Sequence, residues 1–127
     1  MKTLDVLLVE DDLLIGPLLA DMLKNMGYDV CAITTTAPDA VTAAAHYHPG
    51  LVIADVHLGA TNGIDAIDAI LRTGYVHHLF MTGNIAKARA MRPAAVVLEK
   101  PFREAALARA IQQALNIAAP PALAARA

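Results

Sequence analysis

The chain has 127 residues, of which 57% are hydrophobic, 4% are aromatic and none is Trp, so one domain with an aliphatic core is expected. Its 12 acidic and 10 basic residues give a formal net charge of −2, and no basic run stands out, which disfavours direct binding to nucleic acid. The one cysteine cannot form an internal disulfide, no stretch approaches the roughly 20 apolar residues of a membrane span, and the start of the chain lacks the regions of a signal peptide. A cytoplasmic protein without membrane insertion is therefore expected.

Five short, nearly continuous apolar runs predict β-strands along the chain. Runs of this kind are typical of strands that are buried on both faces, as in the parallel sheets of α/β proteins. The expected strands cover residues 4–9, 29–33, 51–54, 76–81 and 95–98.

Apolar residues that recur at spacings of three and four predict a helix after each strand. The expected helices cover residues 14–26, 37–46, 63–72, 85–91 and 103–116, and the fourth is short. Pro17 lacks a backbone donor, so either the first helix starts its regular part near Gly16 or it is kinked in its first turns. Thr36 and Asp39 have the capping-box spacing that opens the second helix.

The alternation of strands and helices indicates an α/β fold of the (βα)5 type. Such a chain forms a parallel five-stranded sheet with right-handed crossovers and helices on both faces, a three-layer sandwich. Residues 1–117 are expected to form this domain. The alanine-rich segment 118–127 has no partner pattern and is expected to be a mobile tail.

Polar residues follow four of the expected strands. Asp11, Asp55, Thr82 and Lys100 come after the first, third, fourth and fifth strands, and parallel strands all exit at one edge of the sheet. Together with Glu10, this edge holds three carboxylates, which cannot all stay ionised at close range unless a cation offsets their repulsion. A hard, oxygen-ligated Mg²⁺ is the natural candidate.

The motifs at these strand ends resemble those of two-component response-regulator receiver domains. They are Leu8-Val9-Glu10-Asp11-Asp12, Val52-Ile53-Ala54-Asp55, Thr82-Gly83 and Glu99-Lys100-Pro101-Phe102. The resemblance runs from about residue 4 to residue 116 and implies the flavodoxin-like strand order 2-1-3-4-5. Phe80-Met81-Thr82-Gly83 is similar to the Phe-x-Thr-Gly motif of an atypical branch from alphaproteobacterial stress signalling.

The resemblance implies a phosphorylation-dependent switch that assists its own phosphoryl transfer and dephosphorylation, and not an enzyme acting on other substrates. Asp55 would accept the phosphoryl group from a sensor histidine kinase or a phosphotransfer protein. Lys100 would stabilise the transferring oxygens, and Thr82 would hydrogen-bond the bound phosphoryl group. The Lys100-Pro101 bond is expected to be cis, although only about 5–6% of X-Pro bonds are.

The resemblance also implies a metal site and two positions that set the lifetime of the phosphoryl group. Asp11, Asp55 and the backbone carbonyl of His57 would ligate Mg²⁺, with Glu10 acting largely through water. The side chains of His57 and Asn84 would position or block the water that attacks the phosphoryl group. The simpler alternative is that both are exposed loop residues without a kinetic role.

The expected output is a change in protein–protein contacts. Because no DNA-binding output domain follows the last helix, the partner is expected to be a downstream protein target, and a homodimer is compatible with the resemblance.

Two departures from the common receiver pattern bear on how phosphorylation would be transmitted to the surface. The segment from Thr82 to Lys100 is shorter than in most receivers, and Val97 stands where many receivers carry an aromatic switch residue.

Other interpretations of these residues are weaker. A phosphotransferase or phosphatase with an aspartyl nucleophile remains an alternative for Asp55, but haloacid-dehalogenase-like phosphatases need a second aspartate where His57 stands. A pseudo-receiver that binds partners without phosphorylation is the other alternative. Asp12 is interpreted as a helix cap and Cys31 as a core residue of the second strand. The four histidines at positions 46, 48, 77 and 78 match no common zinc spacing.

Overall fold

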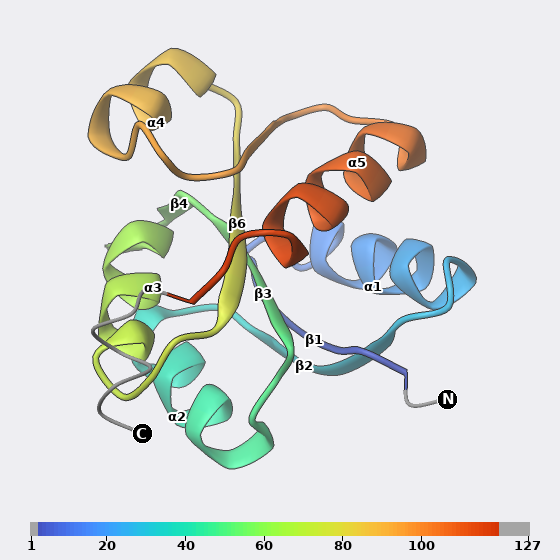
Figure 1. Ribbon diagram of the computed structural model, residues 1–127, viewed down its shortest axis with the longest axis horizontal. Helices are drawn as coiled ribbons and strands as arrows, with labels where there is room; N and C mark the ends of the chain where they lie inside the picture. The colour runs from blue at the N-terminus through green and yellow to red at the C-terminus, as the bar shows by residue number, and fades with distance from the viewer. Residues whose placement is uncertain (1–2, 120–127) are drawn as a thin grey trace.

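The computed structural model describes residues 3–119 and has a five-stranded parallel sheet between two layers of helices (Figure 1). The order of the strands is β2-β1-β3-β6-β7, and each neighbouring pair is parallel. The strands are β1 (Asp5–Val9), β2 (Asp29–Thr34), β3 (Leu51–Asp55), β6 (His77–Thr82) and β7 (Val97–Glu99). This order is the expected 2-1-3-4-5, because β6 and β7 are the fourth and fifth strands of the sheet.

The helices cover both faces of the sheet, as expected for right-handed crossovers. On one face lie α1 (Ile15–Asn25) and α5 (Glu104–Leu115), and on the other lie α2 (Ala37–Tyr47) and α3 (Gly63–Leu71) (Figure 1). The short α4 (Ile85–Met91) follows the end of β6. Between residues 3 and 119, no helix combines the length and hydropathy needed to cross a membrane.

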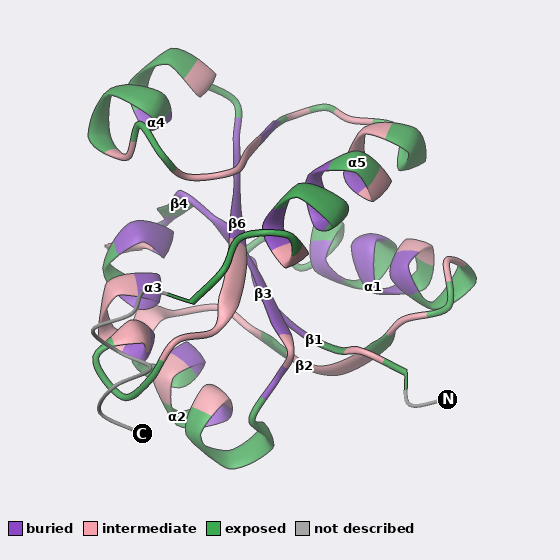
Figure 2. Cartoon of the chain, in the orientation of Figure 1, coloured by how far each residue is buried: buried purple, intermediate pink, exposed green. Residues whose placement is uncertain are grey.

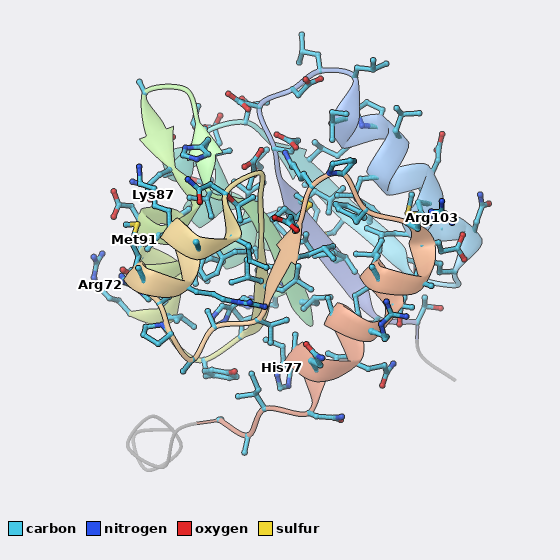
Figure 3. All side chains as sticks on the ribbon, turned by 90° about the horizontal axis from the view of Figure 1, so that it is seen from above. Arg72, His77, Lys87, Met91 and Arg103 are labelled. Atoms are coloured by element: carbon cyan, nitrogen blue, oxygen red, sulfur yellow. The ribbon has the colours of Figure 1, made fainter. Side chains whose placement is uncertain are left out.

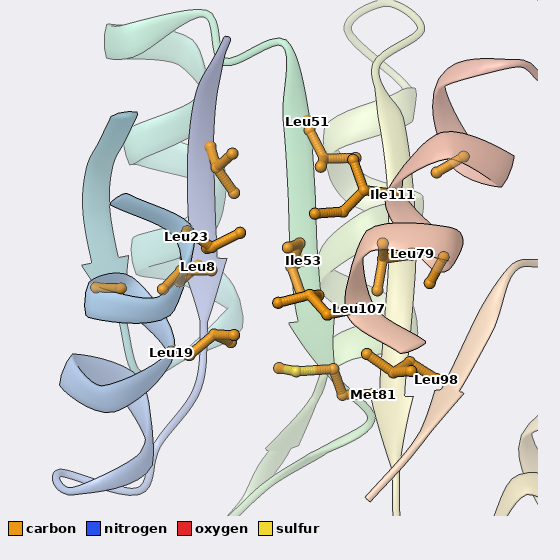
Figure 4. Close-up of a cluster of buried hydrophobic side chains, with 14 residues drawn as sticks. Leu8, Leu19, Leu23, Leu51, Ile53, Leu79, Met81, Leu98, Leu107 and Ile111 are labelled. Atoms are coloured by element: carbon orange, nitrogen blue, oxygen red, sulfur yellow. The ribbon is translucent and has the colours of Figure 1, made fainter. Parts of the chain in front are cut away.

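The sheet divides the hydrophobic core into two clusters. Successive strand residues point to opposite faces, so Leu8 and Ile53 pack under α1 and α5 (Figure 4), while Leu7 and Val52 pack under α2 and α3. β3 is buried over its whole length, and β1 and β6 are buried over their last four residues (Figure 2), which explains why these parts of the sequence are almost continuously apolar. Cys31, on the edge strand β2, is only half-buried against the second cluster.

The start of α1 decides between the two alternatives for Pro17. The helix begins at Ile15, and Pro17 lies in its first turn, where no intrahelical acceptor is needed for its nitrogen. The backbone N–H of Gly16 donates to the carbonyl of Asp12, and the Asp12 carboxylate accepts from Leu14 and Ile15 at 2.8 and 3.0 Å. Asp12 thus caps this turn, as interpreted from the sequence.

The other elements lie within one or two residues of their expected bounds. The capping-box interpretation of Thr36 is confirmed, because its hydroxyl accepts from the backbone N–H of Asp39 at 3.2 Å. The fifth sheet strand starts later than expected, since the N–H of Ala95 donates to the carbonyl of Arg92 and closes a turn. The expected mobile tail over 118–127 lies, from residue 120 onward, outside the described residues.

Candidate functional site

Three carboxylates meet at the carboxyl ends of β1 and β3. Glu10 and Asp11 follow β1, and Asp55 is the last residue of β3, the strand paired with β1. One oxygen from each carboxylate lies within 4.8 Å of the others. Glu10 and Asp55 are buried, with 1% and 6% of their surface exposed, whereas Asp11 is exposed to solvent. The parallel sheet thus brings together the acidic cluster that the sequence predicted.

Lys100 reaches this cluster from the end of β7. Its Nζ donates to Glu10 Oε1 at 2.8 Å and to Asp55 Oδ2 at 2.5 Å. The backbone N–H of Lys100 donates to the carbonyl of Thr82 at 2.8 Å, which joins the ends of β6 and β7. The Lys100-Pro101 peptide bond is cis, as predicted.

The charges of the cluster are unbalanced. Burial raises the pKa of Glu10; the hydrogen bond from Lys100 opposes this, and the nearby Asp55 carboxylate adds to it. Burial alone would lower the pKa of Lys100, but the hydrogen bonds and charges of Asp55 and Glu10 outweigh it and raise that pKa. One ammonium thus faces three carboxylates, counting Asp11, and two negative charges remain if all are ionised. This donor set fits a hard divalent cation such as Mg²⁺.

Thr82 links the acidic cluster to α4. It is buried at the end of β6, one residue beyond Met81, which pairs with Asp55. Its hydroxyl accepts a hydrogen bond from the backbone N–H of Asn84 at 3.0 Å. The Asn84 side chain in turn caps α4 by accepting from the N–H of Lys87 at 3.1 Å. A change at the Thr82 hydroxyl therefore bears directly on the start of this helix.

A small hairpin after β3 borders the site on the other side. It consists of β4 (His57–Leu58) and β5 (Thr61–Asn62), and its first backbone N–H, from His57, donates to Asp55 Oδ1 at 3.0 Å. The His57 side chain is exposed. The hairpin turn brings Gly59, with a φ of 60°, close to the Asp11 carboxylate. Two-residue strands carry no periodic signal, so the sequence did not predict the hairpin.

Gly63 is a positioning residue that the sequence analysis missed. It begins α3 directly against the backbone of Asp55, and a Cβ built on it would lie 2.1 Å from the Asp55 carbonyl oxygen. Its N–H donates to the carbonyl of Val56 at 3.0 Å. Only a residue without a side chain lets the helix approach this closely. The available signal was a glycine that follows the cap residue Asn62.

The four histidines at positions 46, 48, 77 and 78 lie away from this site. His46 and His48 are exposed at the end of α2, and His77 and His78 begin β6, at the opposite end of that strand from Thr82. In the part of the chain that the structure describes, the acidic cluster is the one group of side chains arranged to hold a metal ion.

Comparisons with known proteins agree with this architecture. Residues 6–112 match the family model of the response regulator receiver domain. The chain is 32% identical over 115 residues to the phyllosphere-induced regulator PhyR of Methylorubrum extorquens, a match that covers 87% of this chain but 43% of PhyR. Over 67 residues it is 33% identical to the chemotaxis protein CheY of Thermotoga maritima, covering 53% of this chain and 56% of CheY.

Solved receiver structures have the same fold. The solution structure of the receiver domain of Erythrobacter litoralis PhyR superposes with a TM-score of 0.84 at 34% identity, covering 95% of this chain and 96% of that one. The crystal structure of PhyR from Brucella abortus gives a TM-score of 0.82 at 26% identity and covers 90% of this chain and 48% of PhyR. The chain therefore belongs to the response regulator receiver domain family, the signalling switches of two-component systems.

Proposed function

We propose that the protein accepts a phosphoryl group on Asp55 from a sensor histidine kinase or a phosphotransfer protein, in a Mg²⁺-dependent reaction. The observation that carries the proposal is the Lys100 ammonium, which is bonded to both Asp55 and Glu10 beside the exposed carboxylate of Asp11. A carboxylate nucleophile, a fixed cation and an acidic metal cluster are the parts that phosphoryl transfer to aspartate needs.

The roles of the side chains follow from their contacts. An oxygen of Asp55 bonds to phosphorus while the bond from phosphorus to the donor histidine nitrogen breaks, and that nitrogen keeps the electron pair. Asp11, Asp55 and the His57 carbonyl would ligate Mg²⁺, with Glu10 acting through water, and the bound ion would offset charge on the transferring oxygens. The Lys100 ammonium would stabilise negative charge on the transferring phosphoryl oxygens, because it already lies at hydrogen-bond distance from Asp55.

The phosphoryl group would change α4 through Thr82. If the Thr82 side chain rotates to donate to a phosphoryl oxygen, its Oγ1 moves relative to the N–H of Asn84, from which it accepts a hydrogen bond. Since Asn84 caps α4, the start of this helix would shift and alter contacts with a downstream protein target. Many receivers transmit phosphorylation through a rotating aromatic ring at the position of Val97, which is a half-buried aliphatic residue here. The Thr82 hydroxyl would therefore transmit the signal to α4 in place of such a ring.

The lifetime of the phosphoryl group would depend on His57 and Asn84. The backbone N–H of His57 donates a hydrogen bond to Asp55, and that of Asn84 donates one to Thr82. Both residues therefore lie at the rim of the site. We expect the decay rate of the phosphorylated protein, measured across pH with constant Mg²⁺, to change in His57→Ala and Asn84→Ala. Rates that agree with the wild type within about twofold, roughly 0.4 kcal/mol in barrier, would remove this role.

The proposed setting is the cytoplasm, without direct contact to nucleic acid and with a homodimer as one form of the active protein. A net charge of −2 and a half-buried free thiol at Cys31 are compatible with this setting. The relation to PhyR, whose Bartonella quintana member is described as an anti-anti-sigma factor, supports a protein as the downstream target.

The central test is to incubate the protein with a small phosphodonor and Mg²⁺ and to weigh the intact chain. We expect one added phosphoryl group, none with EDTA and none in Asp55→Ala. Lys100→Ala should keep its circular dichroism spectrum but react at least about tenfold more slowly. An adduct that persists in Asp55→Ala refutes the assignment, no adduct in any sample favours a pseudo-receiver, and repeated release of phosphate from added phosphomonoesters favours a phosphatase.

A further inference from the structure

A hollow lies between α3 and the segment that leads from α4 to β7, away from the acidic cluster. Its volume is about 310 Å³, and its floor is formed by Ile67 and Leu71 of α3 and Phe80 of β6. The short α4 buries only Ala88, and the chain then returns to the sheet over residues 92–96, which line the hollow above Phe80, itself 2% exposed.

Aromatic rings line one wall of the hollow. Tyr75, His78 and Phe80 stack edge to face, with centroid distances of 6.1 Å and 5.9 Å between successive rings. Such a wall favours an apolar or aromatic side chain. The volume is at the lower limit of the roughly 300–1,000 Å³ of small-molecule sites, so the hollow fits one anchoring side chain better than a cofactor.

The rim of the hollow holds the ion pair of Arg92 with Asp68, and further basic side chains lie beyond it at the end of α3 and on α4. Arg92 is fixed there, because its Nη2 pairs with Asp68 at 2.5 Å and its Nη1 donates to the Met91 carbonyl at 2.9 Å. Figure 3 shows Lys87, Met91 and Arg72 in succession along one margin of the molecule, and Met91 is 45% exposed. Between residues 3 and 119, neither Lys87 nor Arg72 forms an ion pair within 4.0 Å.

The local charge differs in sign from that of the whole chain. Residues 85–93 hold three basic side chains and no acidic one, whereas the chain has a net charge of −2. In the adjoining α3, Asp68 pairs with Arg92, whereas Asp65 keeps its negative charge, because its partner, the Asn62 amide at 3.0 Å, is neutral. Three basic side chains, Lys87, Arg89 and Arg72, outnumber it. The free charge beside the hollow is therefore positive.

We propose that this hollow and its rim dock an acidic protein segment that inserts one apolar side chain. The apolar anchor fills the space against Leu71 and Phe80, and carboxylates of the partner pair with Lys87 and Arg72. Burial of the anchor supplies most of the affinity, and the charges supply orientation and association rate. A nucleic acid fits less well, because its backbone leaves the hollow empty and the chain as a whole repels it.

The site is tested with synthetic peptides, and the absence of Trp from the chain makes peptide fluorescence a clean signal. The probe is a nine-residue peptide with one Trp flanked by Asp and Glu. One comparison peptide has Lys at the acidic positions, and another has Ser in place of Trp. We expect the probe to bind at least about tenfold more tightly than either and to shift the amide NMR signals of Leu71, His78 and residues 92–96.

Variants separate the charge from the anchor. Arg72→Gln with Lys87→Gln should weaken the probe at least about threefold at low salt, and the difference should fade at high salt. Lys24→Gln with Arg109→Gln makes the same change of charge on α1 and α5 and should leave binding unchanged. Ala94→Phe fills the hollow and should abolish binding. Asp55→Ala should bind normally, so this result is independent of the phosphorylation proposal.

Several results would overturn the proposal. They are a basic peptide that binds within twofold of the acidic one, NMR shifts that map outside the hollow, and an oligonucleotide that displaces the probe from the same amides. A peptide that copies residues 10–18 of this chain, acidic at its start and rich in leucine, tests a second copy as the occupant. Tighter binding of that peptide than of the probe, together with self-association of the protein, would also overturn it.

Discussion

At the scale of single residues, the position of Asp55, the proposed phosphoacceptor, depends on a glycine at position 63. Three contacts hold Asp55. Lys100 donates to one carboxylate oxygen, the N–H of His57 donates to the other, and Gly63 packs against the backbone carbonyl of Asp55. The first two contacts are polar and adjustable. The third is a steric limit, because any Cβ at Gly63 meets backbone atoms and not the end of a flexible side chain.

Gly63→Ala should therefore disturb both stability and phosphorylation. We expect a loss of about 1–3 kcal/mol in the free energy of unfolding, as for overpacked sites, and slower phosphorylation of Asp55. Urea denaturation and intact mass provide the two readouts. Gly83→Ala is the matched control, since a Cβ there meets no atom within 4 Å. Equal stability of the two variants would contradict the steric interpretation.

Cys31 gives a second test at this scale. Burial raises the pKa of its thiol, and the negative charge of Asp5 adds to the effect. At a pH near the ordinary thiol pKa of about 8.5, the folded protein should thus hold less thiolate than the unfolded chain. We expect iodoacetamide to modify the folded protein at least about threefold more slowly than the protein in urea. The protonated thiol also favours the folded state. This contribution to the free energy of unfolding is complete below the ordinary thiol pKa and is lost as the pH rises through the raised pKa of the folded protein.

At the scale of elements, stability resides in the sheet and in the helix faces that pack on it. Leu79 on β6 is fully buried between the sheet and α5, whereas Leu18 on α1 is 54% exposed. Leu79→Ala should lower the free energy of unfolding by about 2–5 kcal/mol, because it leaves a cavity. The same substitution at Leu18 should change it by less than about 0.5 kcal/mol. Similar urea midpoints for both variants would contradict the assigned core.

The elements also show what the sequence could and could not predict. Strands buried on both faces are continuous apolar runs, so β1, β3 and β6 were placed almost to the residue. The hairpin of β4 and β5 was missed, because its pairing is set by tertiary contacts such as the bond from the Ala37 N–H to Thr61 Oγ1 at 3.3 Å. Cys31 packs against the core, as interpreted, but its half-burial was not predicted, although the expected order 2-1-3-4-5 places its strand at the edge of the sheet.

At the scale of the whole molecule, topology alone assembles the site. Residues 10–11, 55, 82 and 100 are far apart in the chain, and a parallel sheet was predicted to bring them to one edge, while the strand order came from the resemblance to receiver domains. Their pairing was not predictable, because the sequence does not reveal which carboxylates share the Lys100 ammonium. The same holds for the approach of the hairpin turn to Asp11, which depends on the conformation of Gly59 and Ala60 between β4 and β5.

The residual charge of the cluster should link metal binding to global stability. An ion that binds only the folded state stabilises it by about 2.7 kcal/mol at 100 times its dissociation constant. We expect the melting temperature to rise with MgCl₂ relative to EDTA, and to rise much less with NaCl at equal ionic strength. Asp11→Asn should lose most of the increase. An equal response of this variant and the wild type would place the ion elsewhere.

The shortness of α4 has a consequence for local unfolding. A helix that buries a single alanine gains little free energy from packing, so its opening does not require the sheet to open. Figure 2 shows α4 exposed over most of its surface, in contrast to β3 at the centre of the sheet. In native-state hydrogen exchange, the amides of residues 85–91 should exchange through a low-energy fluctuation, while those of β1, β3 and β6 should exchange only on global unfolding.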